Sequence, residues 1–133
     1  MYSRFASTLR LCVTLCVAAS ALTAATALLD GRNVHYSVTG KGPRTLVLVH
    51  GWTCDSTFWS ANVPELAKRY RVINVDLPGH GESDPAPSYS MDAFGDAVIA
   101  VLDEVQVKRA VLVGHSMGGP VILAVARKRP EQV

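Results

Sequence analysis

The residues best suited to chemistry lie in the segment 114–119, which reads Gly-His-Ser-Met-Gly-Gly. A short apolar run precedes this segment, and a run typical of a helix follows it. A serine between a buried strand and a helix fits the G-x-S-x-G pattern of a nucleophile elbow. Gly114 and Gly118 lack a Cβ atom, so they allow the strand and the helix to approach closely. The pattern predicts that Ser116 stands exposed at the end of the strand, where its hydroxyl can attack a carbonyl carbon.

A second segment that could take part in a reaction is His50-Gly51-Trp52, which follows the continuously apolar run 45–49. Such a run is typical of a strand covered on both faces of a parallel sheet. The carboxyl ends of parallel strands share one edge, so we expect this loop beside Ser116. A backbone N–H of the loop and the N–H of Met117 can then hold an oxyanion. The alternative is a plain turn that ends a strand.

The remaining pattern supplies the elements that would position these loops. Apolar or alternating runs predict strands at 33–38, 45–49, 71–75 and 110–113, and helical patterns predict helices at 64–70, 91–104 and 120–129. Ser90 suits the N-cap of the second helix, and Tyr89 and Phe94 suit a hydrophobic staple. Strands that alternate with helices indicate the α/β class, with a mostly parallel sheet and flanking helices.

Other polar side chains have simpler interpretations. His80 lies between two glycines and suggests a general base, but a tight turn explains the loop better. Asp76 at the end of a strand is interpreted as a turn residue rather than a catalytic acid, and His35 as a surface residue. No His/Cys cluster has metal-ligand spacing and no glycine-rich loop matches a phosphate or dinucleotide motif, so neither a metal nor a cofactor is predicted.

The N-terminal region has the pattern of a secretory signal. Two arginines precede an uncharged apolar stretch, and the small residues 25–27 form a cleavage site. We expect a signal peptide at 1–27, cleaved after Ala27, and one domain at 28–133 that is exported to the periplasm or the extracellular space. The alternative is an uncleaved anchor at 11–29, the one case in which a membrane would be a partner.

Composition excludes one class of partner. The net charge of the chain is +2, but two of its 13 Lys and Arg residues belong to the predicted signal, which leaves 11 against 11 Asp and Glu. A neutral domain without a basic stripe gives no reason to propose nucleic acid. Cys54 is the single cysteine outside the signal, so stability must come from an ordinary core rather than from an internal disulfide.

Three motifs together resemble the α/β-hydrolase fold family, in its ester- and lactone-hydrolase branch. They are segments 48–52, 76–83 and 114–119, in the family's order and at its usual separations. The resemblance implies that Ser116 is the nucleophile and that the backbone N–H groups of Trp52 and Met117 form the oxyanion hole. It implies a small ester or lactone as substrate. Serine at the elbow argues against epoxide hydrolases and haloalkane dehalogenases, whose pattern has aspartate there.

The chain departs from the family after the elbow. In the family, the acid and then the histidine of the triad follow the serine, but residues 120–133 contain neither Asp nor His. We therefore expect the N-terminal half of such a fold, with an incomplete sheet, no cap and no activity of its own. The alternative is a non-catalytic binding or structural module, or a pseudoenzyme, on the same scaffold.

Overall fold

A computed structural model of the protein describes residues 22–133. Most of the predicted signal peptide lies outside the described residues. The elements follow in the order β1 (Thr23–Leu29), β2 (Arg32–Thr39), β3 (Thr45–Val49), η1 (Ser56–Trp59), α1 (Val63–Leu66), β4 (Arg71–Val75), α2 (Met91–Glu104), β5 (Ala110–Gly114), α3 (Gly118–Lys128) and η2 (Pro130–Gln132). Among the helices of this part, none is long and apolar enough to cross a bilayer.

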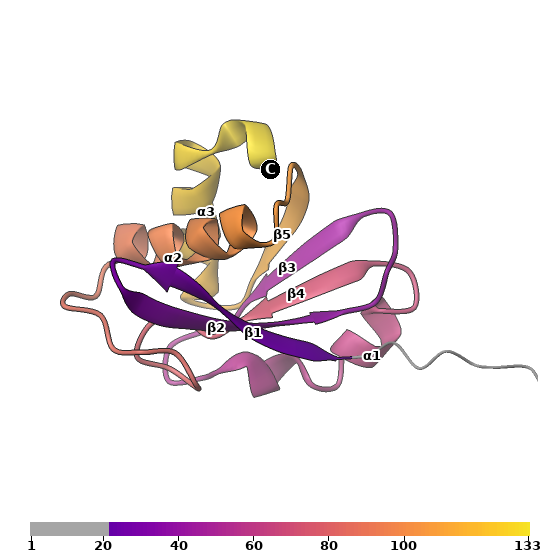
Figure 1. The fold of residues 1–133 in the computed structure, drawn as a ribbon, viewed down its shortest axis with the longest axis horizontal. Coiled ribbons are helices and arrows are strands. Elements are labelled where there is room, and N and C mark those ends of the chain that lie inside the picture. Colours follow the sequence, from indigo (N-terminus) through magenta and orange to yellow (C-terminus); the bar gives the residue numbers. More distant parts are fainter. Residues whose placement is uncertain (1–21) are drawn as a thin grey trace, which may run out of the picture.

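The five strands form one open, mixed sheet in the order β1-β2-β4-β3-β5 (Figure 1). β3 lies between β4 and β5 and is parallel to both, whereas β2 is antiparallel to β4 and to β1. A parallel connection needs a crossover, and α2 supplies it between β4 and β5. The predicted α/β class with a parallel set of strands and flanking helices is confirmed.

Helices cover both faces of the sheet. α2 and α3 lie on one face and α1 on the other, as Figure 1 shows. Alternate strand residues point to opposite faces, so Val47 and Val49 join the core under α2 and α3 while Leu46 and Leu48 join a smaller cluster on the α1 side. This two-sided burial explains why the strand sequences are continuously apolar.

The local signals at α2 act as predicted. Ser90 Oγ accepts a hydrogen bond from the Ala93 N–H at 3.0 Å, which satisfies one of the free donors of the first turn. The rings of Tyr89 and Phe94 lie 6.0 Å apart between centroids. The helix predicted at 64–70 is shorter in the structure, where α1 ends at Leu66 and turns lead into β4.

The strand β1 was not expected. It pairs with β2 along its whole length, from Thr23 opposite Val38 to Leu29 opposite Arg32. Ala27 within it is only 1% exposed. The sheet therefore starts at Thr23, ahead of the domain boundary predicted at residue 28, and cleavage after Ala27 would remove most of β1. Whether the chain is cleaved stays a prediction.

Candidate active site

The elbow lies where β5 ends and α3 begins. Ser116 has a φ of 53°, in the left-handed region that side chains other than glycine rarely adopt. The Gly118 N–H donates to the His115 carbonyl at 2.8 Å, and the Gly119 N–H donates to the Ser116 carbonyl at 2.9 Å. These bonds close a sharp turn, and the Ser116 side chain is exposed at its top. The predicted bend and the exposed position of the serine are confirmed.

Two glycines make this turn sterically feasible. A Cβ atom on Gly118 would collide with the backbone oxygen of Val49 in β3, and one on Gly114 would collide with the backbone oxygen of Gly118. Both neighbours are backbone atoms, which cannot swing aside as a side chain can. A Cβ atom on Gly119 would meet nothing within 4 Å. The two elbow glycines therefore allow strand, turn and helix to pack together.

Gly118→Ala is expected to destabilise the fold by about 1–3 kcal/mol, because the added methyl must push α3 away from β3. The matched control is Gly119→Ala, which adds the same methyl one residue later into open space. It should leave stability unchanged or raise it by up to about 1 kcal/mol, since alanine favours a helix. Urea unfolding followed by circular dichroism measures both, and equal midpoints for the two variants would contradict the steric argument.

The loop after β3 lies directly against the elbow. Val49 and Gly114 are register partners at the ends of their strands, so both loops leave the sheet side by side. A Cβ atom on Gly51 would lie 3.2 Å from Ser116 Cβ and 3.0 Å from His115 Nδ1. The structure therefore brings together the two segments that the sequence singled out.

Two backbone donors near the serine are free. Neither the Trp52 N–H nor the Met117 N–H has an acceptor among residues 22–133. Met117 directly precedes α3, whose N-terminal end favours negative charge. The Trp52 side chain is 60% exposed, so it belongs to the rim of the site rather than to the core. Free N–H groups of this kind can stabilise an anionic oxygen.

His50 is buried and has a structural role. The Leu77 N–H donates to His50 Nε2 at 3.0 Å, so the ring proton is on Nδ1, which donates to the Gly51 carbonyl at 2.8 Å. Burial lowers the pKa of His50, which keeps the ring neutral. Both ring nitrogens are therefore occupied in tying the loop after β3 to the end of β4, and His50 cannot serve Ser116 as a base.

His80 lies in a tight turn, as predicted. The glycines on either side, Gly79 and Gly81, have positive φ values, and His80 Nδ1 lies 3.0 Å from the Pro78 carbonyl. The His80 ring lies 5.7 Å from the Trp52 ring and helps to line a hollow of about 400 Å³. Within residues 22–133, no hydrogen bond reaches Ser116 Oγ from this or any other side chain.

Asp76 is more than a turn residue. Its side chain is almost fully buried, and Oδ1 accepts from the Ser56 N–H at 2.6 Å while Oδ2 accepts from the Glu82 N–H at 3.1 Å. Oδ2 also lies 2.9 Å from His35 Nδ1, and the His35 side chain is only 14% exposed, so the expectation that His35 is a surface residue was wrong. One carboxylate thus joins β2, the loop after β3 and the loop after β4.

The charge of Asp76 is maintained by its donors. Burial alone raises the pKa of the carboxyl, but hydrogen bonds from the Ser56 and Glu82 backbones and from His35 outweigh it and hold the pKa below its usual value. Sequence reasoning missed this cluster. The one available signal was an aspartate that ends a buried strand and precedes a Gly-x-Gly turn.

A wall of aromatic rings stands beside the elbow. Phe58 stacks on the exposed ring of His115, with centroids 4.1 Å apart, and Trp59 packs edge-on against Phe58 at 5.0 Å. Phe58 is 42% exposed. Phe58 therefore offers an apolar surface beside the elbow that carries Ser116.

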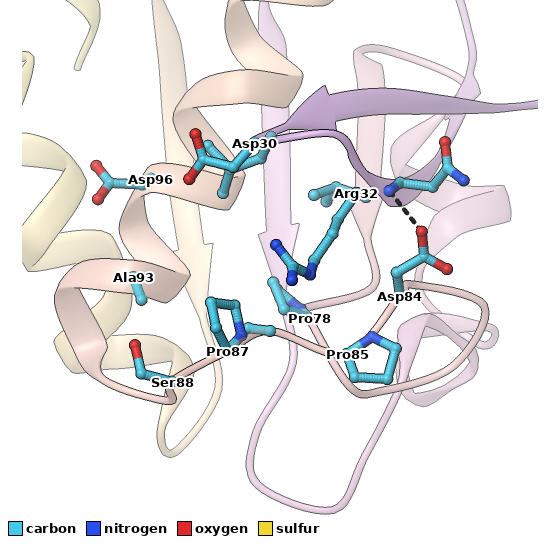
Figure 2. A pocket seen from close by; sticks show the side chains of 13 residues that line it. Asp30, Arg32, Pro78, Asp84, Pro85, Pro87, Ser88, Ala93 and Asp96 are labelled. Atoms are coloured by element: carbon cyan, nitrogen blue, oxygen red, sulfur yellow. Dashed lines mark hydrogen bonds between the residues drawn. The ribbon is translucent and has the colours of Figure 1, made fainter.

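Another hollow, of about 360 Å³, lies between the β1–β2 turn, the loop 84–88 and α2 (Figure 2). Arg32 extends over Pro78 in this view, and Asp84 accepts a hydrogen bond from the Asn33 N–H at 2.7 Å. Ser116, Trp52 and Met117 are not among its lining residues. This hollow is therefore separate from the candidate active site.

The sequence profile of the alpha/beta hydrolase family matches residues 46–131, which include all three motifs. The chain belongs to the alpha/beta hydrolase family. It is the N-terminal portion of that fold, with the family's sheet and flanking helices.

Individual known proteins resemble the chain over this portion. It is 46% identical over 99 residues to the dihydrolipoyllysine-residue acetyltransferase component of the acetoin cleaving system of Pseudomonas putida, covering 74% of this chain and 27% of that protein. It is 37% identical over 101 residues to the pimeloyl-[acyl-carrier protein] methyl ester esterase of Nitrosomonas europaea, covering 76% and 38%.

Among solved structures, Est816, described as an N-acyl homoserine lactone degrading enzyme, superposes with a TM-score of 0.78 at 34% identity, covering 82% of this chain and 42% of that one. The chain thus spans between about a quarter and two fifths of the length of these relatives.

Proposed function

We propose that this hydrolase cleaves carboxylic esters or lactones with Ser116 as its nucleophile. The observation that carries the proposal is the exposed Ser116 at a φ of 53°, in a turn that Gly114 and Gly118 make sterically possible. The loop that contains Gly51 packs directly against this turn. The relatives support the substrate class, since one is named for a methyl ester and another for an acyl homoserine lactone. Both compounds offer a carbonyl carbon bonded to an oxygen leaving group.

The proposed reaction follows from the positions of the groups. Ser116 Oγ attacks the carbonyl carbon, and the Trp52 and Met117 N–H groups donate to the oxygen that becomes negative. The tetrahedral intermediate collapses to an acyl-enzyme as its bond to the alcohol oxygen breaks and the alcohol takes up a proton, and water then hydrolyses the acyl-enzyme to release the acid. A serine hydroxyl needs a base to take its proton. Both ring nitrogens of His50 are already hydrogen-bonded, and residues 120–133 have no histidine. We therefore expect residues 1–133 alone to show no serine-dependent turnover.

Labelling with an organophosphonate ester tests the nucleophile. The sample is the protein made from its own gene, including any residues that follow Val133. The protein is expected to label at Ser116, and Ser116→Ala is expected to abolish the label. Ser60→Ala, at an exposed serine outside the turn, is the matched control and should label fully. A label on another residue, or none, would show that the proposed nucleophile is wrong.

A non-catalytic module on the same scaffold is the second candidate function. It is favoured by one observation, the absence of a hydrogen-bonded base at Ser116 Oγ within residues 22–133. The gene downstream of codon 133 separates the two. An in-frame continuation with an aspartate and then a histidine supports the enzyme, and a stop codon supports the module or a pseudoenzyme.

We also propose that the protein is exported. The support is in the sequence, where arginines at 4 and 10 precede an apolar run in the order typical of a secretory signal. An uncleaved membrane anchor is the alternative.

A further inference from the structure

We propose that the signal is cleaved between Ala21 and Leu22, which makes Leu22 the first residue of the mature protein. The inference rests on the proposed export. It moves the cleavage site six residues upstream of the small-residue site at 25–27. Two independent observations support cleavage after Ala21. They are the packing of β1 in the structure and a second small-residue motif in the sequence.

The structure uses residues 23–27 in the sheet. Ala27 lies opposite Val34 in β2, and each is 1% exposed. Ala25 lies opposite Tyr36 and packs against the same core, on the face that α2 covers. Cleavage after Ala27 would leave the outer edge of β2 without most of its partner strand and would open Val34 to water. An exposed apolar edge of that kind promotes aggregation.

Residues 19–21 provide the alternative site. They read Ala-Ser-Ala, which has the same small-x-small form as Ala-Thr-Ala at 25–27. Residues 11–18 then form the apolar region after Arg10, and their number falls within the roughly 7–15 residues typical of such regions. Cleavage at this point hydrolyses one peptide bond. The carboxyl group remains on Ala21 and the new amine on Leu22.

The mature end would suit the fold. Leu22 precedes β1 by one residue and is 66% exposed. The new ammonium group would therefore lie in water, while every residue of β1 is retained. The small side chains of β1 allow the sheet to pack closely against α2. Because a signal-peptide cleavage site also consists of small residues, residues 25–27 have the same pattern as such a site.

The test is the N-terminus of the processed chain. The whole 133-residue chain is expressed in a Gram-negative host, and total denatured protein is read by intact mass and N-terminal sequencing, so that misfolded variants are also counted. The wild type should begin at Leu22. Ala21→Leu should prevent this cleavage, and the matched variant Ala27→Leu should still begin at Leu22 because its altered residue lies inside the mature chain.

Each outcome decides a different part of the proposal. A chain that begins at Leu28 overturns the position and preserves export. A chain that retains its first residues overturns both the position and the cleaved signal, in favour of an anchor or of no export. Any other terminus, or a wild-type terminus in Ala21→Leu, overturns the position. None of these results bears on Ser116, whose labelling is a separate measurement.

Discussion

Replacement of Ser116 by alanine is expected to lower kcat for ester or lactone hydrolysis about 10⁶-fold, the loss seen when a triad serine is removed from a comparable enzyme. The physical reason is that the covalent route needs the hydroxyl, and only binding and the oxyanion hole remain without it. The measurement uses the protein made from its own gene, with any residues after Val133, on an activated ester and on an acyl lactone.

Controls separate loss of the nucleophile from loss of the fold. Ser116→Ala removes no buried packing contact, because the side chain is exposed. This variant should therefore unfold at the same urea concentration as the wild type. Ser60→Ala should keep full activity. A fall of less than about 100-fold in Ser116→Ala would indicate that another group attacks the substrate, since even a single oxyanion-hole donor contributes about that much.

Asp76→Asn is expected to cost about 3 kcal/mol in the free energy of unfolding. The carboxylate accepts from two backbone N–H groups and faces the His35 ring, and an amide replaces one acceptor by a donor. A hydrogen bond to a charged group contributes about 1.5–3 kcal/mol, and a buried donor without a partner adds a penalty. Because Asp76 joins the loops on either side of the site, hydrolysis should also fall.

The matched control for Asp76 is Asp103→Asn, at an exposed pair with Arg129 on the surface. Exposed pairs contribute at most about 1 kcal/mol, so this variant should unfold nearly as the wild type does. Equal losses in the two variants would contradict the proposed role of the buried cluster.

The effect of Asp76 depends on pH in a defined direction. Its folded-state pKa lies below the usual 3.8, so its contribution is fully present above about pH 4. As the pH falls further, the unfolded chain binds a proton before the folded chain does, and the contribution is lost through the folded-state pKa. The stability difference between wild type and Asp76→Asn should therefore shrink as the pH is lowered below about 4.

The elbow was accessible from sequence because it is local. A strand, a turn and a helix within residues 110–128 generate the steric problem, and glycines at two fixed offsets solve it. Apolar runs at 45–49 and 71–75 also define buried strands without knowledge of their partners. Parallel strands share a carboxyl edge, so the contact between Gly51 and Ser116 followed from these local features.

The strand β1 could not be recognised from its own residues. Alanine favours helices and threonine favours strands, so residues 23–29 give no consistent strand signal, and an apolar stretch that begins at residue 11 has the composition of a secretory signal. Pairing with β2 and packing against α2 make residues 23–29 a strand. Tertiary context thus decides the conformation of this segment, because the strand preference of a residue depends on its cross-strand neighbours and its burial.

Sequence alone determined which hydroxyl is presented and which backbone groups surround it, because a tight turn dictates its residue types within a few positions. The tertiary structure decided what holds those loops in place. Asp76 and His35 are 41 positions apart in sequence, and His50 and Leu77 are 27 apart. No periodicity connects residues at such separations. Their hydrogen bonds exist because the sheet brings the middle of β2 beside the carboxyl ends of β3 and β4, where buried polar groups must find partners.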